Sequence, residues 1–488
     1  MTDPAISPIR SPAARMPRWL VLLAVALLVR ALTFGNPILH VDEEFYFATA
    51  QAIARGAIPY IDVWDRKPVG LFLLYLPAGA LGLPLGIWAY QAMALASVTA
   101  TATLIARLAD RAGWARGALP AAIAYLLWLN LLEGEGGQTP VFYNLLMVAA
   151  AGLLAPRPDD ATQATRRLLY GCRAFALVGL ALQIKYTVLF EGLFFGLAWM
   201  WREARLGRAW WRVALSAIPL AALAALPTLA VWNWFWAHGY GDAFLYANFE
   251  SIGARGGDPM ARELGNLALM ALVVSPLAAM AILGVRGPAW NGTPVLRRWL
   301  LGWAIVATLG VLVFRGYFDH YALPLLVPFC IAAAGFFADH RRAKQIRGPL
   351  LVSVLLASQV VLLVKRHERG TPAEFAAVTH AIGNGPGCLY VFSGSPMLYP
   401  AAERCAVTRY RFPRHIGQAR ERGAIGADQQ GELERIMALR PAIVVLGRTY
   451  SGERADLRAL FERFVAMHYR PRADLPLGTG RIAVYARR

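Results

Sequence analysis

The chain is long, apolar and basic: it has 488 residues, 57% of them hydrophobic, a mean hydropathy of +0.44 and a formal net charge of +19. This composition excludes an ordinary soluble globular protein, because such proteins are far less apolar overall. The positive excess is mostly arginine in short loops between apolar segments, a pattern typical of membrane orientation and not of nucleic-acid binding. We therefore predict an integral membrane protein without a nucleic-acid partner.

Apolar segments follow one another as far as residue 364, and most are near the length that crosses a bilayer as a helix. We predict about eleven spans in a polytopic α-helical membrane protein, because the arginine-rich short loops then all lie on one side. That side is assigned to the cytoplasm of a bacterial cell, with the N-terminus, and the C-terminal region to the periplasmic face of the inner membrane. The predicted spans are 19–33, 87–106, 118–132, 142–154, 174–184, 186–201, 213–236, 267–283, 300–314, 323–337 and 350–364.

The composition changes after residue 365, where short apolar runs alternate with helix-like stretches. The runs CLYVF, AIVVLG and RIAVYA predict strands, and residues 431–439 and 454–467 predict helices, as in a small α/β domain. This region contains no glycine-rich nucleotide-binding loop. This region is therefore either a scaffold or acceptor-docking surface, or a cap without a function of its own.

We divide the chain into two domains on this basis. Residues 1–365 form a transmembrane catalytic module with a first periplasmic loop at 35–86, and residues 366–488 form a soluble periplasmic α/β domain. Cys388 and Cys405 of the second domain are able to form a disulfide if the domain is periplasmic, but the sequence does not supply their geometry.

The first outer loop carries an unusual concentration of charge in a chain that is only 16% charged. Asp42, Glu43 and Glu44 are consecutive, and a second cluster with Asp65 and Lys67 follows about twenty residues later. Acids favour a helix N-terminus, so helix capping is the structural alternative. Capping accounts for one acid but not for three and a second cluster, and ionisable groups near lipid are candidates for function. We predict that this loop is the reaction site.

The remaining outer loops bring further charged residues to the same side of the bundle. A carboxylate there is suited to act as general base towards an acceptor, while Lys and Arg stabilise a departing phosphate. Structural alternatives stay open, since Lys185 can snorkel, Arg315 can bind lipid headgroups and His320 can be structural. The predicted group is Asp42, Glu43, Lys67, Glu133, Lys185, Arg255, Arg315 and His320.

The runs VDEEFYFATAQAIARG and WDRKPVGLFLLYL resemble the first periplasmic loop of the GT-C glycosyltransferases of family 39, which include protein O-mannosyltransferases and lipid A aminoarabinose transferase. That family has an Asp-Glu pair, a nearby tyrosine and a Lys-Pro-Pro-Leu segment. Asp42, Glu43, Tyr46, Lys67 and Pro68 match it, but valine and glycine follow in place of the second proline and the leucine. GLALQIKYTVLFEGL and FRGYFDHYALPLLVPFCIAAAG are similar to later family segments, so the resemblance covers most of the membrane region in order.

The resemblance implies a GT-C fold, a polyprenyl-phosphate-linked sugar donor, inversion at the sugar carbon and catalysis at the periplasmic face. It makes Asp42 the general base or its closest counterpart, paired with Glu43, and it places Lys67 and Arg315 at the phosphate. The acceptor is a lipid, a glycan or a protein of the cell envelope, such as lipopolysaccharide, and membrane lipids surround the enzyme. The predicted substrate-binding residues are Tyr46, Lys67, Lys185, Arg255, Arg315, His320 and Tyr321.

Two alternative functions remain at this stage. A non-enzymatic assembly or sensor protein, whose C-terminal region binds a partner, does not need the charged first loop. A transporter or flippase of a lipid-linked saccharide also has many spans, although such proteins often show two repeated halves and midplane charges that this sequence lacks. No cofactor is implied, and the clustered acids leave a divalent metal open, but no His-rich ligand spacing argues for one.

Overall fold

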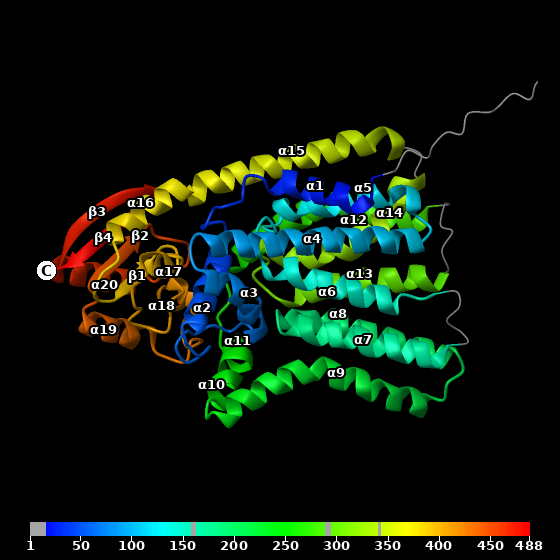
Figure 1. The fold of residues 1–488 in the computed structure, drawn as a ribbon, viewed down its shortest axis with the longest axis horizontal. Coiled ribbons are helices and arrows are strands. Elements are labelled where there is room, and N and C mark those ends of the chain that lie inside the picture. Colours follow the sequence, from blue (N-terminus) through cyan, green and yellow to red (C-terminus); the bar gives the residue numbers. More distant parts are fainter. Residues whose placement is uncertain (1–15, 158–162, 288–293, 340–342) are drawn as a thin grey trace, which may run out of the picture.

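The computed structural model describes residues 16–157, 163–287, 294–339 and 343–488. Every predicted span falls on a helix, and these helices lie side by side in a bundle (Figure 1). Their bounds are α1 (Arg18–Arg30), α4 (Leu85–Arg111), α5 (Ala115–Leu131), α6 (Thr139–Leu154), α7 (Ala164–Leu182), α8 (Leu189–Arg205), α9 (Trp210–Ala237), α12 (Met260–Arg286), α13 (Pro294–Val313), α14 (Leu326–Asp339) and α15 (Ala343–Arg369).

Six helical stretches among the described residues are long and apolar enough to cross a membrane, by length and composition alone. The other predicted spans fall on shorter helices, so the predicted number of about eleven spans stays a prediction. The stretch that contains α14 is the most buried of the six, at 78%, whereas that of α9 is only 11% buried. The many exposed leucine and tryptophan side chains of α9 are the surface expected for contact with lipid.

Two helices of the first outer loop lie across one end of the bundle, between it and the C-terminal domain (Figure 1). They are α2 (Val41–Ala54) and α3 (Val69–Leu81), and both match the predicted loop 35–86. Short elements add to the same end, namely η2 (Tyr186–Val188), α10 (Gly241–Leu245), η3 (Tyr246–Glu250), α11 (Ser251–Gly253) and η4 (Asp319–Leu325).

The C-terminal domain contains one four-stranded sheet in the order β1-β2-β4-β3. Strands β1 (Leu389–Ser393) and β2 (Ile443–Gly447) are parallel, and β4 (Gly480–Arg487) pairs antiparallel with β2 and with β3 (Tyr469–Leu477). The sequence predicts every strand except β3. That strand contains prolines, which argue against a strand, but β3 is at the edge of the sheet, where proline is tolerated.

Helices surround this sheet, and two of them match the helices that the sequence predicts. The helices are α16 (Pro372–Ile382), α17 (Leu398–Ala402), α18 (Pro413–Gly417), η5 (Ala419–Glu421), α19 (Gln429–Leu439) and α20 (Ala455–His468). The division predicted at residue 365 falls inside α15, because the helix continues past its last apolar residues to Arg369 and ends before Gly370.

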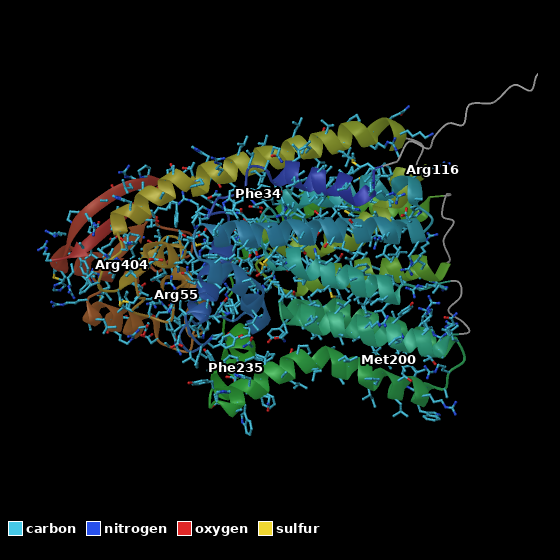
Figure 2. All side chains as sticks on the ribbon, viewed as in Figure 1. Phe34, Arg55, Arg116, Met200, Phe235 and Arg404 are labelled. Carbon is cyan, nitrogen blue, oxygen red and sulfur yellow. A yellow bond between two sulfur atoms is a disulfide. The ribbon has the colours of Figure 1, made fainter. Side chains whose placement is uncertain are left out.

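A disulfide joins Cys388 and Cys405 across 4.5 Å between their Cα atoms. Arg404, beside it, lies at the end of the molecule opposite Arg116, which marks the far end of the bundle (Figure 2). Disulfides persist in oxidising compartments, and arginine-rich loops lie on the cytoplasmic side of membranes. The disulfide therefore lies at one end of the molecule, and the arginine-rich loops of the bundle lie towards the other.

Candidate active site

Helix α2 begins immediately before the three consecutive acids. The imidazole Nδ1 of His40 accepts a hydrogen bond from the backbone N–H of Asp42 at 3.1 Å, so a histidine caps this helix. The acids occupy the first turn instead, where the helix dipole favours negative charge, so none of them is the N-cap. Consecutive positions of a helix point about 100° apart, so the three carboxylates reach three different environments.

The carboxylate of Asp42 lies among cations. Burial raises its pKa, but the positive charge of Lys67, together with the nearby basic rings of His40 and His320, outweighs burial and holds the pKa well below its usual range. The side chain is therefore ionised at any physiological pH. Asp42 forms no hydrogen bond through its carboxylate to another described residue, which leaves its oxygens available to a bound molecule.

Lys67 approaches Asp42 from the segment before α3. Its Nζ lies 5.0 Å from the centre of the Tyr46 ring and 3.5 Å from Oδ2 of Asp65. The hydroxyl of Tyr60 donates to the Lys67 carbonyl at 2.8 Å and fixes the backbone there. The valine and glycine that depart from the family pattern follow Pro68. Packing explains the glycine, because a Cβ at Gly70 would lie 2.5 Å from the Gln183 Cβ, so only glycine fits.

Lys185 faces the same carboxylate from the turn between α7 and η2. Its Nζ lies 4.8 Å from the centre of the Tyr321 ring, and the lysine makes no ion pair or hydrogen bond with the described residues. Burial and the charge of Lys67 lower its pKa to about 8, although Asp42 opposes this. We call Asp42, Lys67 and Lys185 the Asp42 cluster. Two cations of this cluster flank one carboxylate and retain the capacity to bind an anion.

Glu43 and Glu44 turn away from this cluster. Glu43 is 1% exposed and packs so closely on the loop after α5 that a Cβ at Gly136 meets its Oε2 at 2.0 Å. Burial raises the pKa of Glu43 to about 7. Ser395 of the C-terminal domain donates a hydrogen bond to Glu44, whose pKa burial also raises to about 7. The predicted catalytic pair is thus separated, and only Asp42 faces Lys67 and Lys185.

A second group of charged side chains surrounds Glu133. His40 Nε2 and His320 Nδ1 lie 3.2 and 3.1 Å from the same oxygen, Oε2 of Glu133. Arg369 donates to the other oxygen at 2.9 Å. Lys365 and Glu135 complete the group, with 3.4 Å between them. We call His40, Glu133, Glu135, His320, Lys365 and Arg369 the Glu133 cluster. The sequence predicts that His320 binds substrate, and in the structure its ring is paired with Glu133.

The ligand atoms of His40, Glu133 and His320 lie within 4.8 Å of one another, the kind of spacing that can hold a metal ion. The hydrogen bonding of His40 opposes this. Because the N–H of Asp42 donates to Nδ1, that nitrogen is unprotonated, and the neutral ring carries its proton on Nε2, where it donates to Glu133. A metal at Nε2 displaces this proton and requires Nδ1 to carry one. The described hydrogen bonds therefore account for this geometry without a metal.

Arg255 and Arg315 lie elsewhere at the same end of the molecule. Arg255 pairs with Glu421 of η5 at 2.7 Å, and Arg66, next to Lys67, donates to the same carboxylate at 2.7 Å. Arg315 pairs with Glu263 at 2.8 Å and makes no ion pair with the Asp42 cluster within the part of the chain that the structure describes.

The C-terminal domain contacts the site directly, which the sequence does not predict. Phe412 and His415 pack on Phe45 at 5.3 and 5.9 Å between ring centres, and His415 lies 4.6 Å from Trp64. The Glu421 carboxylate, 2% exposed, ties this domain to the segment that bears Lys67. The sequence marks only the acidic run before Phe45 as part of a site. It does not reveal the contacts with the C-terminal domain, because the contacting residues of the first loop and of that domain are more than 300 residues apart.

Comparison with solved structures identifies the fold. The chain is similar to ArnT from Cupriavidus metallidurans, crystallised with undecaprenyl phosphate, with a TM-score of 0.64, 13% identity, and coverage of 96% of this chain and 98% of that chain. It is also similar to the oligosaccharyltransferase AglB from Archaeoglobus fulgidus, solved with an inhibitory peptide and a dolichol-phosphate, with a TM-score of 0.51, 13% identity, and coverage of 88% and 69%. The chain therefore has the GT-C fold, as the resemblance implies. Neither the family models nor the curated proteins compared with the sequence gave a match.

Proposed function

We propose that this protein is a membrane glycosyltransferase that moves a sugar from a polyprenyl-phosphate donor to an envelope acceptor at the periplasmic face. The observation that carries this proposal is the Asp42 cluster: one ionised carboxylate near two lysines, at one end of a bundle with the GT-C fold. The acceptor class is a lipid, a glycan or a protein.

The disposition of the two lysines suits a leaving group that carries phosphate. Lys185 has no anionic partner among the described residues. Lys67 has one, Asp65, and the 3.5 Å between Lys67 Nζ and Asp65 Oδ2 is long for an ion pair. A phosphate that bridges the two ammonium groups gains charge-assisted hydrogen bonds. These interactions strengthen as the sugar–phosphate bond breaks and charge moves onto the phosphate oxygen.

Asp42 is placed to take the proton of the acceptor hydroxyl. The acceptor oxygen attacks the anomeric carbon from the face opposite the phosphate, the bond from that carbon to the phosphate oxygen breaks, and the polyprenyl phosphate leaves with the electron pair. The low pKa of Asp42 depends chiefly on the positive charge of Lys67. A bound phosphate neutralises Lys67, so the carboxylate becomes a stronger base only when the donor is present.

The proposed orientation places the Asp42 cluster outside the bacterial inner membrane, with the N-terminus in the cytoplasm and the C-terminal domain in the periplasm. The Cys388–Cys405 disulfide supports an oxidising location for that domain. No nucleotide site is needed there, because the donor already contains the bond that is broken.

The experiment uses the full-length protein in liposomes that contain polyprenyl phosphate carrying a labelled sugar, together with an envelope extract as acceptor. We expect the label to move to the acceptor and free polyprenyl phosphate to appear. A protein that moves the intact donor between leaflets and leaves the sugar on its carrier is a transporter, and that result contradicts the proposal. Comparing surface glycans of a deletion strain with those of its parent then identifies the acceptor.

A further inference from the structure

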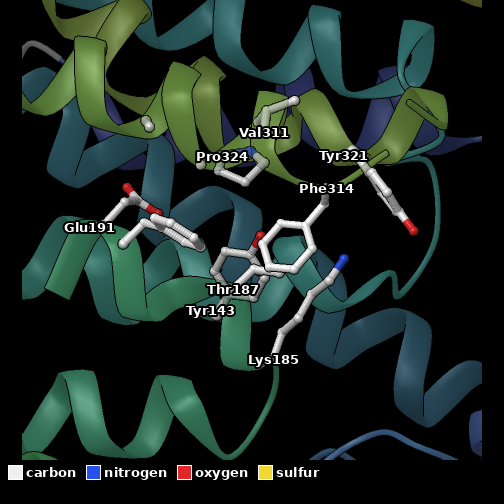
Figure 3. A pocket seen from close by; sticks show the side chains of 11 residues that line it. Tyr143, Lys185, Thr187, Glu191, Val311, Phe314, Tyr321 and Pro324 are labelled. Carbon is white, nitrogen blue, oxygen red and sulfur yellow. The ribbon is translucent and has the colours of Figure 1, made fainter. Parts of the chain in front are cut away.

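A pocket leads from the Asp42 cluster into the bundle. The empty space inside it is about 540 Å³, including the part that is open to solvent. Lys185 and Tyr321 stand at one end, and Glu191 stands at the other, with Tyr143 and Thr187 between them (Figure 3). The pocket therefore has a cation at one end and a carboxyl group at the other.

Glu191 is the feature that the proposed chemistry does not use. It lies on α8, is 5% exposed, and one of its oxygens accepts a hydrogen bond from the indole N–H of Trp303 at 2.5 Å. It makes no other hydrogen bond with the described residues. A carboxyl group among apolar helices is costly to bury, so it needs polar partners. Trp303 satisfies one oxygen only, and the group lines a cavity.

The walls between the two ends are aromatic and apolar. Phe190 and Phe314 contribute rings, and Val311 and Pro324 contribute aliphatic surface. A sugar has apolar C–H faces that pack on aromatic rings and hydroxyl groups at its rim that require polar partners. A sugar phosphate therefore fits the sequence of groups along the pocket. Its phosphate lies at Lys185, its ring lies between the aromatic walls, and its hydroxyl groups lie at Glu191.

We infer that this pocket holds the sugar of the donor, and that Glu191 accepts a hydrogen bond from the substituent on the sugar carbon remote from the phosphate. This inference rests on the proposed function. The substituent is a hydroxyl or an ammonium group, because a carboxyl group accepts hydrogen bonds from both. A uronic acid, which carries its own carboxylate, is excluded by repulsion at the same place. Glu191 is thereby a specificity-determining residue.

The test measures binding to purified full-length protein of sugar-free polyprenyl phosphate and of polyprenyl phosphates that carry a neutral hexose, an amino sugar or a uronic acid. For Glu191→Leu we expect affinity for the preferred sugar-bearing donor to fall by roughly three- to tenfold, as loss of one hydrogen bond implies. Affinity for sugar-free polyprenyl phosphate stays unchanged. Equal affinity of wild type and Glu191→Leu for every donor overturns the inference, and so does an equal loss for donor and sugar-free carrier.

Two further variants separate specificity from structure. Glu191→Gln keeps the size of the side chain, and we expect it to bind the uronic acid donor more tightly than the wild type does. Trp303→Phe removes the indole N–H but leaves Glu191, so donor discrimination persists if the carboxyl group acts on the sugar. Discrimination lost in Trp303→Phe and kept in Glu191→Gln overturns the inference. The proposed function fails separately, if the wild type binds none of these polyprenyl phosphates.

Discussion

Two groups of charged residues lie at the same end of this molecule, and they differ in how their charges are paired. In the Glu133 cluster each carboxylate oxygen of Glu133 has a partner at 3.2 Å or less, from His40, His320 or Arg369. In the Asp42 cluster the carboxylate and Lys185 form no hydrogen bond or ion pair with the described residues. Both groups contain buried charge, so burial does not separate a structural site from a reactive one. We propose instead that the reactive site is the one whose charged groups have no partner among the described residues.

The largest effect is expected from Asp42→Asn. An asparagine keeps the size of the side chain but does not take up the acceptor proton, so turnover should fall by about 10²–10⁴-fold, the usual contribution of a general base. The measurement is transfer of labelled sugar in liposomes at saturating donor. Donor affinity should be kept, because Lys67 and Lys185 remain. Unchanged turnover removes Asp42 from the mechanism and ends the distinction between the clusters.

Glu133→Gln should act on stability. The substitution leaves His40, His320 and Arg369 without their shared anion, and removing one partner of a buried ion pair costs about 3–5 kcal/mol. Because Glu133 is 17% exposed at its side chain, we expect the lower end of this range. Thermal unfolding in detergent measures it. A variant that keeps the wild-type melting temperature but loses turnover makes the Glu133 cluster the reactive one.

The two lysines should affect donor binding. Lys67→Ala and Lys185→Ala each remove one cation from the phosphate, and we expect a loss of about 1.5–3 kcal/mol, or roughly 10–150-fold in the KM of the donor. Lys365→Ala is the matched control, since this lysine lies in the Glu133 cluster. Titration of each variant with donor gives the KM. Equal effects of Lys185→Ala and Lys365→Ala contradict a phosphate site at the Asp42 cluster.

The smallest effect is on pH dependence. Lys185 has a pKa of about 8, so its amino group is mostly protonated well below pH 8 and loses its charge as the pH rises above 8. We expect kcat/KM for the donor to decline above pH 8, by at most about tenfold per pH unit. Lys185→Arg keeps the charge at high pH and should remove this decline. A profile that declines identically in Lys185→Arg assigns the titration to another group.

Much of the membrane region was predictable from the sequence, because the hydropathy of a span and the arginines beside it can both be read from one short stretch of sequence. The acids of the first loop and Lys67 were also visible as charge in an apolar chain. The different surroundings of Asp42 and Glu43 follow from helical periodicity once α2 is known to begin at Val41. The family pairing did not reveal this separation, because neighbouring letters in a motif do not show which way each side chain points.

Contacts between the two domains were not predictable. Glu421 meets Arg66 and Arg255, and Ser395 meets Glu44, across hundreds of residues without any local pattern. The sequence therefore gave Arg255 a ligand role, whereas the structure shows its partner in η5. The histidine cap was missed for another reason: His40 precedes the acids directly, but Ser, Thr, Asp and Asn are the residues expected at that position.

The most direct measurement is a cryo-EM structure of the full-length protein with undecaprenyl phosphate. The account places the phosphate between the ammonium groups of Lys67 and Lys185, within about 4 Å of each Nζ, with Asp42 facing the side from which an acceptor arrives. A phosphate held by Lys365 and Arg369 instead, next to Glu133, contradicts the account.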